Sequence, residues 1–421
     1  MRSGGGNVGR RMLGWMMLLG GAAFFCLAGA DQAWASRRHY YRPHRHHAVY
    51  VGGPAAPALR GGLVEDADTG RVLYAYNADM PWPPASMAKM MMLLVAEDQI
   101  RAGRLHLTDQ VVVSYNAAHT GGERLGLHTG DVYPLGELMK AALIKSANDA
   151  AVAVAEKVGG SIPGCVELMN EKARSLDLRS TRYNTVDGLP PSAGHDVDVT
   201  SAYDLATVGR TIVNRTDLLR WSSQEECPFD NGPRMLHNTN HLIGHFDGCD
   251  GIKTGFTYHA GFNLTATAKR GDMRLIAVVL GAPSNWGRFR EAARLLDWGF
   301  ENFTAVTLAK RGETLPVRVQ ITSGAVIQPV AAEDVKVVIP KRDVSGVKIE
   351  YAVPSAFNGP LLIGSPIGLV NVHSGGRVVA RVGALSPVSV GNASQLMGTS
   401  VVHEEPGGVQ GVAVDAHNTA E

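Results

Sequence analysis

The sequence predicts an α/β sandwich followed by a small all-β domain. Between residues 62 and 303, strand patterns lie at the two ends of the segment and helical patterns lie between them. Between residues 304 and 390, short Val- and Ile-rich runs are separated by Gly, Pro and Asp, with no helical pattern. The 421 residues contain 45% hydrophobic side chains and carry a formal charge of +1. This composition provides for two cores and gives no indication of nucleic-acid binding.

The N-terminus has the pattern of an export signal. Two arginines precede an apolar run over 12–30, and Ala33-Trp34-Ala35 supplies the small residues of a cleavage site. We therefore predict a signal peptide over 1–35 and export to the periplasm or cell envelope. A retained anchor is the alternative, because the run is close to the length that spans a bilayer. A basic linker rich in His, Pro and Gly is expected over 36–61.

The elements of the α/β domain follow in order. Residues 63–67 and 72–76 flank the turn Asp68-Thr69-Gly70, a pattern typical of a β-hairpin. Apolar residues at helical spacing then predict a core-facing helix from Met87 to Arg101. Further helices are predicted over 134–143, 149–158 and 288–298, and two paired strands over 262–268 and 273–280.

The end of the chain and its cysteines complete the organisation. The catalytic domain is predicted over 62–303, the small β domain over 304–390 and a disordered tail over 391–421. Cys26 leaves with the signal, so the remaining three cysteines form one disulfide at most. A pairing of Cys227 with Cys249 and three free thiols are the two alternatives.

Three short motifs occur in an order that one mechanism requires. They are Ser86-Met87-Ala88-Lys89 at the start of a helix, Ser146-Ala147-Asn148 between two helices, and Lys253-Thr254-Gly255 at the start of a strand. Each motif alone is weak evidence, because a helix cap, a helix junction and a turn produce the same letters. Together they indicate a serine nucleophile that is activated by a lysine.

The spacing predicts the roles of these side chains. Positions i and i+3 share a helix face, so Lys89 is expected beside the Ser86 hydroxyl. A lysine acts as a base only when neutral, which requires burial or a nearby positive charge such as Lys253. Ser146 is expected to carry the proton to the leaving amine, and Asn148 to hold Lys89 and a substrate amide.

The facing strand is expected to bind a carboxylate. Lys253 and Thr254 supply a cation and a hydroxyl, and Gly255 is expected to let the substrate backbone approach closely. Backbone N–H groups are expected to complete the site as an oxyanion hole.

The sequence resembles the low-molecular-mass penicillin-binding proteins that act as D-alanyl-D-alanine carboxypeptidases. The similarity runs over 63–300 and rests on three segments, Pro84 to Met90, Ser146 to Ala153 and Asp250 to Gly255, the last followed by Ala260 to Leu264. The family's trailing β domain resembles 304–390. The resemblance implies a β-lactamase/transpeptidase-like sandwich with an antiparallel sheet and helices.

The resemblance also implies residue roles and partners. Ser86 matches the acylated nucleophile, Lys89 its base, Ser146 and Asn148 the second motif, and Lys253 and Thr254 the carboxylate site. The N–H groups of Ser86 and Phe256 match the oxyanion hole, and Arg288 matches an arginine near the substrate carboxylate, with a helix cap as the alternative reading. Peptidoglycan stem peptides ending in D-Ala-D-Ala are the implied substrates and β-lactams the implied inhibitors. No metal and no organic cofactor is expected.

Three other functions use a similar fold. A class A β-lactamase needs a deacylating glutamate, and Glu167-Leu168-Met169-Asn170 lacks its spacing. A D,D-endopeptidase and a non-catalytic wall-binding scaffold remain as alternatives to the carboxypeptidase. The family's membrane-bound members end in an amphipathic helix, whereas 401–421 has no apolar face, so membrane association through the C-terminus is not expected.

Overall fold

The computed structural model describes residues 58–190 and 196–391. The predicted signal peptide, most of the predicted linker and nearly all of the predicted tail lie outside these residues, so those predictions remain as they stand. Within the described residues, the predicted fold class is confirmed.

A five-stranded antiparallel sheet forms the centre of the first domain. Its strand order is β2-β1-β9-β8-β7, so β7 is an edge strand. The strands are β1 (Gly61–Asp66), β2 (Val72–Tyr76), β7 (Cys249–Thr257), β8 (Gly261–Arg270) and β9 (Met273–Ala282). Segments far apart in the sequence therefore meet in one sheet, since β1 pairs with β9 through Leu63 opposite Val278.

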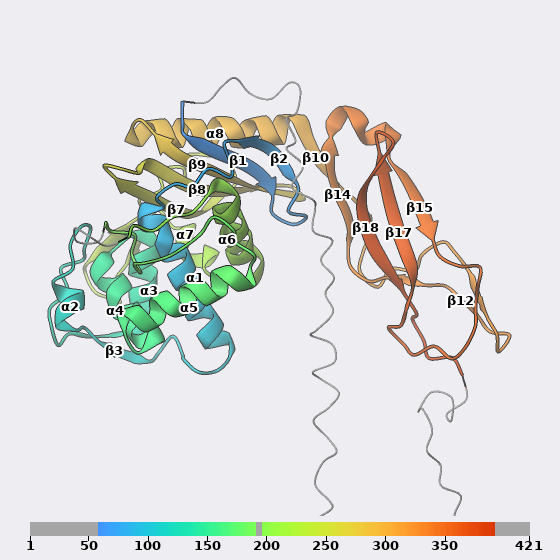
Figure 1. Ribbon diagram of the computed structural model, residues 1–421, viewed down its shortest axis with the longest axis horizontal. Coiled ribbons are helices and arrows are strands. Elements are labelled where there is room, and N and C mark those ends of the chain that lie inside the picture. The colour runs from blue at the N-terminus through green and yellow to red at the C-terminus, as the bar shows by residue number, and fades with distance from the viewer. Residues whose placement is uncertain (1–57, 191–195, 392–421) are drawn as a thin grey trace, which may run out of the picture. The chain divides into compact units, whose positions relative to one another are not determined.

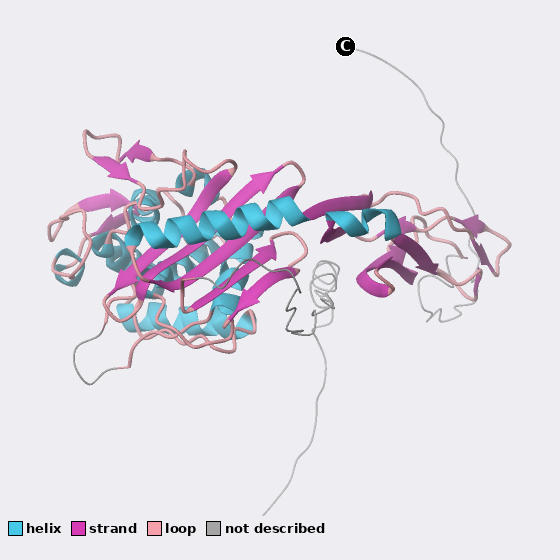
Figure 2. Cartoon of the chain, turned by 90° about the horizontal axis from the view of Figure 1, so that it is seen from above, coloured by secondary structure: helices cyan, strands magenta, loops and turns pink. Residues whose placement is uncertain are grey.

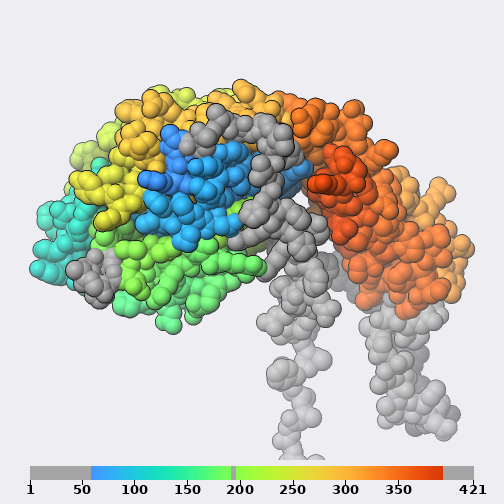
Figure 3. All heavy atoms as spheres, turned by 45° about the horizontal axis from the view of Figure 1, so that its top comes forward, coloured from blue at the N-terminus to red at the C-terminus, as the bar shows by residue number. Residues whose placement is uncertain are grey.

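Helices cover both faces of this sheet (Figures 1 and 2). The helix α8 (Asn285–Asn302) packs on β8 and β9, and Tyr74 of β2 meets Trp298 of α8 with ring centroids 5.9 Å apart. In the space-filling view, the blue β1–β2 hairpin lies against the gold atoms of α8 (Figure 3). Neighbouring side chains of β9 pack in different cores, because successive side chains of a strand point to opposite faces of the sheet. Ile276 faces the helical layer and Leu275 faces α8.

The other face carries the helical layer, whose centre is α1 (Ala88–Arg101). The sequence predicts one apolar face for this helix, but the structure buries every residue from Ala88 to Glu97. Neighbouring helices contact α1 on several sides, and a helix that is buried all round needs no polar face. These neighbours are α3 (Leu135–Ile144), α4 (Asn148–Gly159), α5 (Ile162–Ser175) and α6 (Ala202–Arg215).

Shorter elements connect this frame. They are η1 (Ala85–Met87), β3 (Gln110–Val112), α2 (Tyr115–Ala118), β4 (Val132–Pro134), α7 (Leu219–Ser222), β5 (Glu226–Pro228) and β6 (Met235–His237). Cys227 on β5 packs in the core of the helical layer, whereas Cys249 on β7 packs toward the α8 side. Both are free thiols, as is Cys165, so the predicted Cys227–Cys249 pairing is wrong and the alternative of three free thiols holds.

The second domain contains strands and one 3₁₀ helix. Its strands are β10 (Phe303–Ala309), β11 (Val319–Ile321), β12 (Val326–Ile327), β13 (Val330–Ala331), β14 (Val335–Pro340), β15 (Lys348–Ala352), β16 (Ala356–Phe357), β17 (Pro366–Ser374) and β18 (Arg377–Leu385), with η2 at Lys341–Gly346. Alternating aliphatic residues of β14, β17 and β18 form its core.

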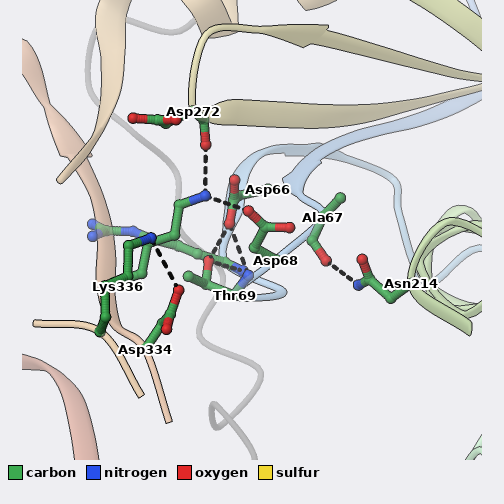
Figure 4. Close-up of polar contacts among 10 residues, drawn as sticks. Asp66, Ala67, Asp68, Thr69, Asn214, Asp272, Asp334 and Lys336 are labelled. Carbon is green, nitrogen blue, oxygen red and sulfur yellow. Dashed lines mark hydrogen bonds and ion pairs between the residues drawn. The ribbon is translucent and has the colours of Figure 1, made fainter. Parts of the chain in front are cut away.

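Polar contacts join β14 to the turns of the first domain's sheet (Figure 4). Lys336 donates to the carboxylate of Asp68, in the β1–β2 turn, and to the carbonyl oxygen of Asp272, in the β8–β9 turn. The β1–β2 turn is itself closed by Asp66, whose carboxylate accepts from the backbone N–H of Thr69 at 2.8 Å. None of the helices in the described parts of the chain is both long and apolar enough to cross a membrane.

Candidate active site

The nucleophile motif lies where the chain turns into the central helix. Ser86 is in η1, and Lys89 is in the first turn of α1 with no exposed surface. The Nζ atom of Lys89 lies 3.0 Å from the Ser86 hydroxyl and 2.8 Å from the carbonyl oxygen of Asp187, to which it donates. The predicted pair of Ser86 and Lys89 is therefore brought together by their i, i+3 spacing.

Burial prepares Lys89 to act as a base. Loss of hydration lowers the pKa of its ammonium group to about 8, against the opposing charges of Asp187, Asp198 and Asp149. Burial and the charge of Lys253 were the two causes expected from the sequence, and burial is the one that lowers the pKa of Lys89 here. With a pKa of about 8, about a tenth of Lys89 is neutral at pH 7, and the lone pair of that form is within reach of the Ser86 proton.

A second lysine and hydroxyl pair faces the first. Ser146 lies between α3 and α4 with a left-handed backbone, φ 66°, and its hydroxyl accepts from Lys253 Nζ at 2.8 Å. Lys253 is buried in the middle of β7 and not at the start of a strand as predicted, because β7 already begins at Cys249. It also donates to the carbonyl oxygen of Thr254 at 2.9 Å. Burial first, and then the charges of Lys89 and Arg288, hold the pKa of Lys253 well below its usual range.

Asn148 has other partners than the sequence suggested. Its Nδ2 donates to the carbonyl oxygen of Gly121 at 2.7 Å, and its backbone N–H donates to Glu123 at 2.7 Å. The two hydrogen bonds of Lys89 go to Ser86 and Asp187, so Gly121 takes the place predicted for Lys89. The Oδ1 atom of Asn148 is buried without a hydrogen-bond partner, which leaves it available for an N–H group of a substrate.

The Thr254 and Gly255 positions are set by β7. The Thr254 hydroxyl donates to Thr239 at 2.7 Å. A Cβ atom at Gly255 would lie 2.6 Å from the carbonyl oxygen of Pro84 and 3.2 Å from the backbone nitrogen of Met87. Glycine is therefore required here because the nucleophile turn packs directly on β7, which is a different reason from the substrate approach that we predicted.

The last two predicted residues lie at the end of β7 and behind it. Phe256 is 44% exposed and stacks on Phe262, with centroids 4.3 Å apart. Arg288, on α8, is buried, and its Nη1 donates to the carbonyl oxygen of Gly255 at 3.2 Å. Burial lowers the pKa of Arg288 to about 10. Arg288 thus holds the backbone of the site strand, and its buried Nε has no partner.

Sequence reasoning missed the loop that carries Asp187 and Gly188. The Asp187 carbonyl oxygen holds Lys89, and a Cβ at Gly188, where φ is +80°, would lie 1.8 Å from the carbonyl oxygen of Ala85. The buried carboxylate of Asp198 anchors this loop by accepting from the backbone N–H groups of Asn184 and Thr185. The Asp-Gly dipeptide is a turn signal, but nothing local in the sequence indicates that the turn meets the nucleophile.

Asp149 was also missed as a positioning residue, although it follows Asn148 directly. Its buried carboxylate accepts from the backbone N–H groups of Leu125, Gly126 and Leu127, at distances of 2.8 to 3.1 Å. These hydrogen bonds fix residues 125–127, which follow shortly after Gly121, whose carbonyl oxygen accepts from Asn148. Over 58–190 and 196–391, no group of three or more His, Cys, Asp or Glu residues is placed to hold a metal ion.

The two lysine and hydroxyl pairs, with an unpartnered amide oxygen between helices, define a site for acyl transfer through a serine. Comparison with known proteins agrees with this class. The family described as D-alanyl-D-alanine carboxypeptidase matches residues 56–284, and the family described as penicillin-binding protein 5, C-terminal domain, matches 303–392.

Several relatives are similar over most of the chain. The D-alanyl-D-alanine carboxypeptidase DacF of Bacillus subtilis is 33% identical over 79% of this chain and 85% of its own. The crystal structure of penicillin-binding protein 5 from Haemophilus influenzae is 30% identical, with TM-score 0.72, over 81% of this chain and 99% of that one. Penicillin-binding protein D2 from Listeria monocytogenes, solved in an ampicillin-bound form, is 27% identical with TM-score 0.52 over 59% of this chain and 99% of that one.

The chain belongs to the D-alanyl-D-alanine carboxypeptidase family of low-molecular-mass penicillin-binding proteins. It is a serine-type peptidase of this class, and these comparisons do not favour the endopeptidase or the scaffold.

Proposed function

We propose that the chain removes the terminal D-alanine from peptidoglycan stem peptides through an acyl-enzyme on Ser86. The observation that carries the proposal is the pairing of two buried lysines with two hydroxyls, Lys89 with Ser86 at 3.0 Å and Lys253 with Ser146 at 2.8 Å. A serine beside a lysine with a lowered pKa is the arrangement that nucleophilic attack requires.

The reaction runs in two stages. The Ser86 oxygen attacks the carbonyl carbon of the penultimate D-alanine, and its proton passes to the neutral amine of Lys89. The peptide C–N bond breaks as Ser146 gives its proton to the departing D-alanine amine, and Ser146 regains a proton from Lys89, which becomes neutral again. A water molecule then adds to the ester carbonyl and gives a proton to Lys89. The bond from the acyl carbon to the Ser86 oxygen breaks as Lys89 returns that proton to Ser86, and the shortened peptide is released.

The remaining residues bind and orient the substrate. Lys253 and Thr254 receive the terminal carboxylate, and Asn148 Oδ1 accepts an N–H of the peptide. The N–H groups of Ser86 and Phe256 stabilise the oxyanion. Arg288 supports the carboxylate site from behind β7, through Gly255. A β-lactam acylates Ser86 by the same first stage.

Release of D-alanine from a pentapeptide ending in D-Ala-D-Ala tests this function. The wild-type chain is expected to release it, and Ser86→Ala to lose at least about a thousandfold in rate, as removal of a catalytic nucleophile does. Ser345→Ala, an exposed serine of the second domain, serves as the matched control and keeps the wild-type rate. Equal rates in wild type and Ser86→Ala contradict the proposal.

We also propose that the chain works outside the cytoplasm, as its N-terminal signal pattern supports. Fractionation of cells that express the full chain is expected to recover it with the cell envelope or periplasm, shortened by about the 35 residues of the signal. Recovery of the full-length chain from the cytoplasm contradicts this.

A further inference from the structure

Exposed aromatic side chains gather where the site strand ends. Four aromatic residues are exposed in the described parts of the chain, and three of them are Phe256 (44%), Tyr258 (95%) and Trp286 (62%). The fourth, Tyr115, is on α2. Single exposed aromatics are ordinary, but three that are linked through a chain of neighbouring rings call for a reason.

These three belong to one connected set of rings, which we call the aromatic row. Tyr258 meets Phe256 with centroids 5.8 Å apart, and Phe256 stacks on Phe262 at 4.3 Å. The Arg288 guanidinium lies over Phe262 at 5.5 Å and over Phe289 at 4.8 Å. Phe289 in turn meets Trp286 at 6.0 Å. The aromatic row is therefore Tyr258, Phe256, Phe262, Phe289 and Trp286.

The inner rings of the row hold its outer rings in place, and the fold does not need the outermost one. Phe289, on α8, belongs to the core between α8 and the sheet, and Phe262 packs against that core. Phe256 is opposite Phe262 in the β7–β8 pairing. Tyr258 lies in the turn after β7, and at 95% exposed it adds almost nothing to the core. An aromatic ring that is already held in place loses little conformational entropy when a ligand binds to it.

The direction of the substrate brings it to this ring. Its terminal carboxylate is assigned to Lys253 and Thr254, and its reacting carbonyl to the N–H of Phe256. The rest of the peptide therefore runs along the edge of β7 toward Tyr258. At a rise of about 3.4 Å per residue, the residue before the D-alanine pair comes opposite Thr257, the last residue of β7, and a long side chain there extends to the ring of the adjacent Tyr258.

We infer that Tyr258, supported by Phe256, is a specificity subsite for the residue that precedes D-Ala-D-Ala, and that it favours a long aliphatic side chain there. The inference rests on the proposed carboxypeptidase function. Methylene groups of such a side chain cover the ring face, whereas a glycine at this position leaves the ring in water.

Two acetylated tripeptides test the inference, one with Nε-acetyl-lysine and one with glycine before D-Ala-D-Ala. The measured quantity is the ratio of their kcat/KM values for D-alanine release. The wild-type ratio is expected to favour the lysine peptide, and Tyr258→Ser to reduce that ratio about two- to tenfold. The glycine peptide keeps its rate in Tyr258→Ser, and Tyr258→Phe keeps the wild-type ratio.

Tyr115→Ser is the matched control, because Tyr115 is the other tyrosine that is exposed in the residues that the structure describes. It is expected to leave the ratio unchanged. A wild-type ratio of one, or an unchanged ratio in Tyr258→Ser, overturns the subsite. An equal loss on both peptides overturns it too, because that result assigns Tyr258 to the shape of the turn. Absence of D-alanine release from both peptides by the wild type instead overturns the proposed function itself.

Discussion

At the residue scale, the reactivity of the site depends on a lysine that lies entirely out of water. Lys89 keeps two hydrogen bonds, to the Ser86 hydroxyl and the Asp187 carbonyl, and it is ringed by carboxylates that partly offset its burial. Without these carboxylates the pKa of the buried Lys89 would fall further, and the lysine would hold a proton received from Ser86 less readily. The balance near a pKa of about 8 suits a group that does both.

This balance predicts the pH dependence of the free enzyme. Neutral Lys89 is the active form, so kcat/KM for D-alanine release is expected to rise with pH and to level off above about 8. Below that value the rate falls about tenfold for each pH unit, because the neutral fraction falls in that proportion. Initial rates at low substrate concentration across the pH range measure the profile.

Lys157→Gln is the control for this profile, since Lys157 is exposed on α4 and is expected to leave the profile unmoved. A profile that stays flat from about pH 6 to about pH 9, or that falls with rising pH, contradicts the role of neutral Lys89.

At the scale of elements, the site is held by the close approach of three segments. The β7 strand packs on η1 at Gly255, and the loop with Gly188 packs on the carbonyl of Ala85 in the same turn. Ala85 itself has a left-handed backbone, φ 51°, which costs free energy. This conformation persists because β7 at Gly255 and the loop at Gly188 both pack on the turn. The position of Ser86 therefore depends on residues that never touch the substrate.

Replacement of Gly188 by alanine tests this dependence. The added Cβ would meet the Ala85 carbonyl at 1.8 Å, so the nucleophile turn must move. The rate of acylation by penicillin is expected to fall at least about tenfold, because misplacement of a nucleophile by about 1 Å costs that much or more. The rate of adduct formation, followed by mass, measures it.

Gly312→Ala is the matched control for the backbone cost, because Gly312 has nearly the same φ, +79°, but open space around it. The control is expected to acylate as the wild type does. If Gly188→Ala also acylates at the wild-type rate, the loop does not position Ser86.

These elements show which parts of the fold and of the site could be predicted from the sequence. The helix after Ser86, the hairpin at Asp68-Thr69-Gly70 and the β8–β9 pair follow from local periodicity and turn residues, and the structure has them. The contacts of Asp187, Gly188 and Thr239 with the site join residues of high sequence separation, which local patterns do not encode. The need for glycine at position 255 was predicted from substrate approach and not from packing, because Pro84, the residue that it packs on, is distant in the sequence.

At the scale of the whole molecule, every predicted site residue belongs to the first domain. The motif residues lie on η1, α1, α4 and β7 and in the turn between α3 and α4, and the arginine lies on α8, so the sheet and both of its helical layers take part. The second domain contacts the turns at Asp68 and Asp272 through Lys336, whereas η1, which carries Ser86, contacts α1 and β7. The acylation chemistry is therefore assigned to residues 58–302.

The central claim is that Ser86 becomes covalently acylated, and the intact mass of the full chain after incubation with penicillin tests it most directly. The wild type is expected to gain the mass of one penicillin molecule, and Ser86→Ala to gain none while Ser345→Ala gains one. An unmodified wild type, or an adduct of equal yield on Ser86→Ala, would contradict the account.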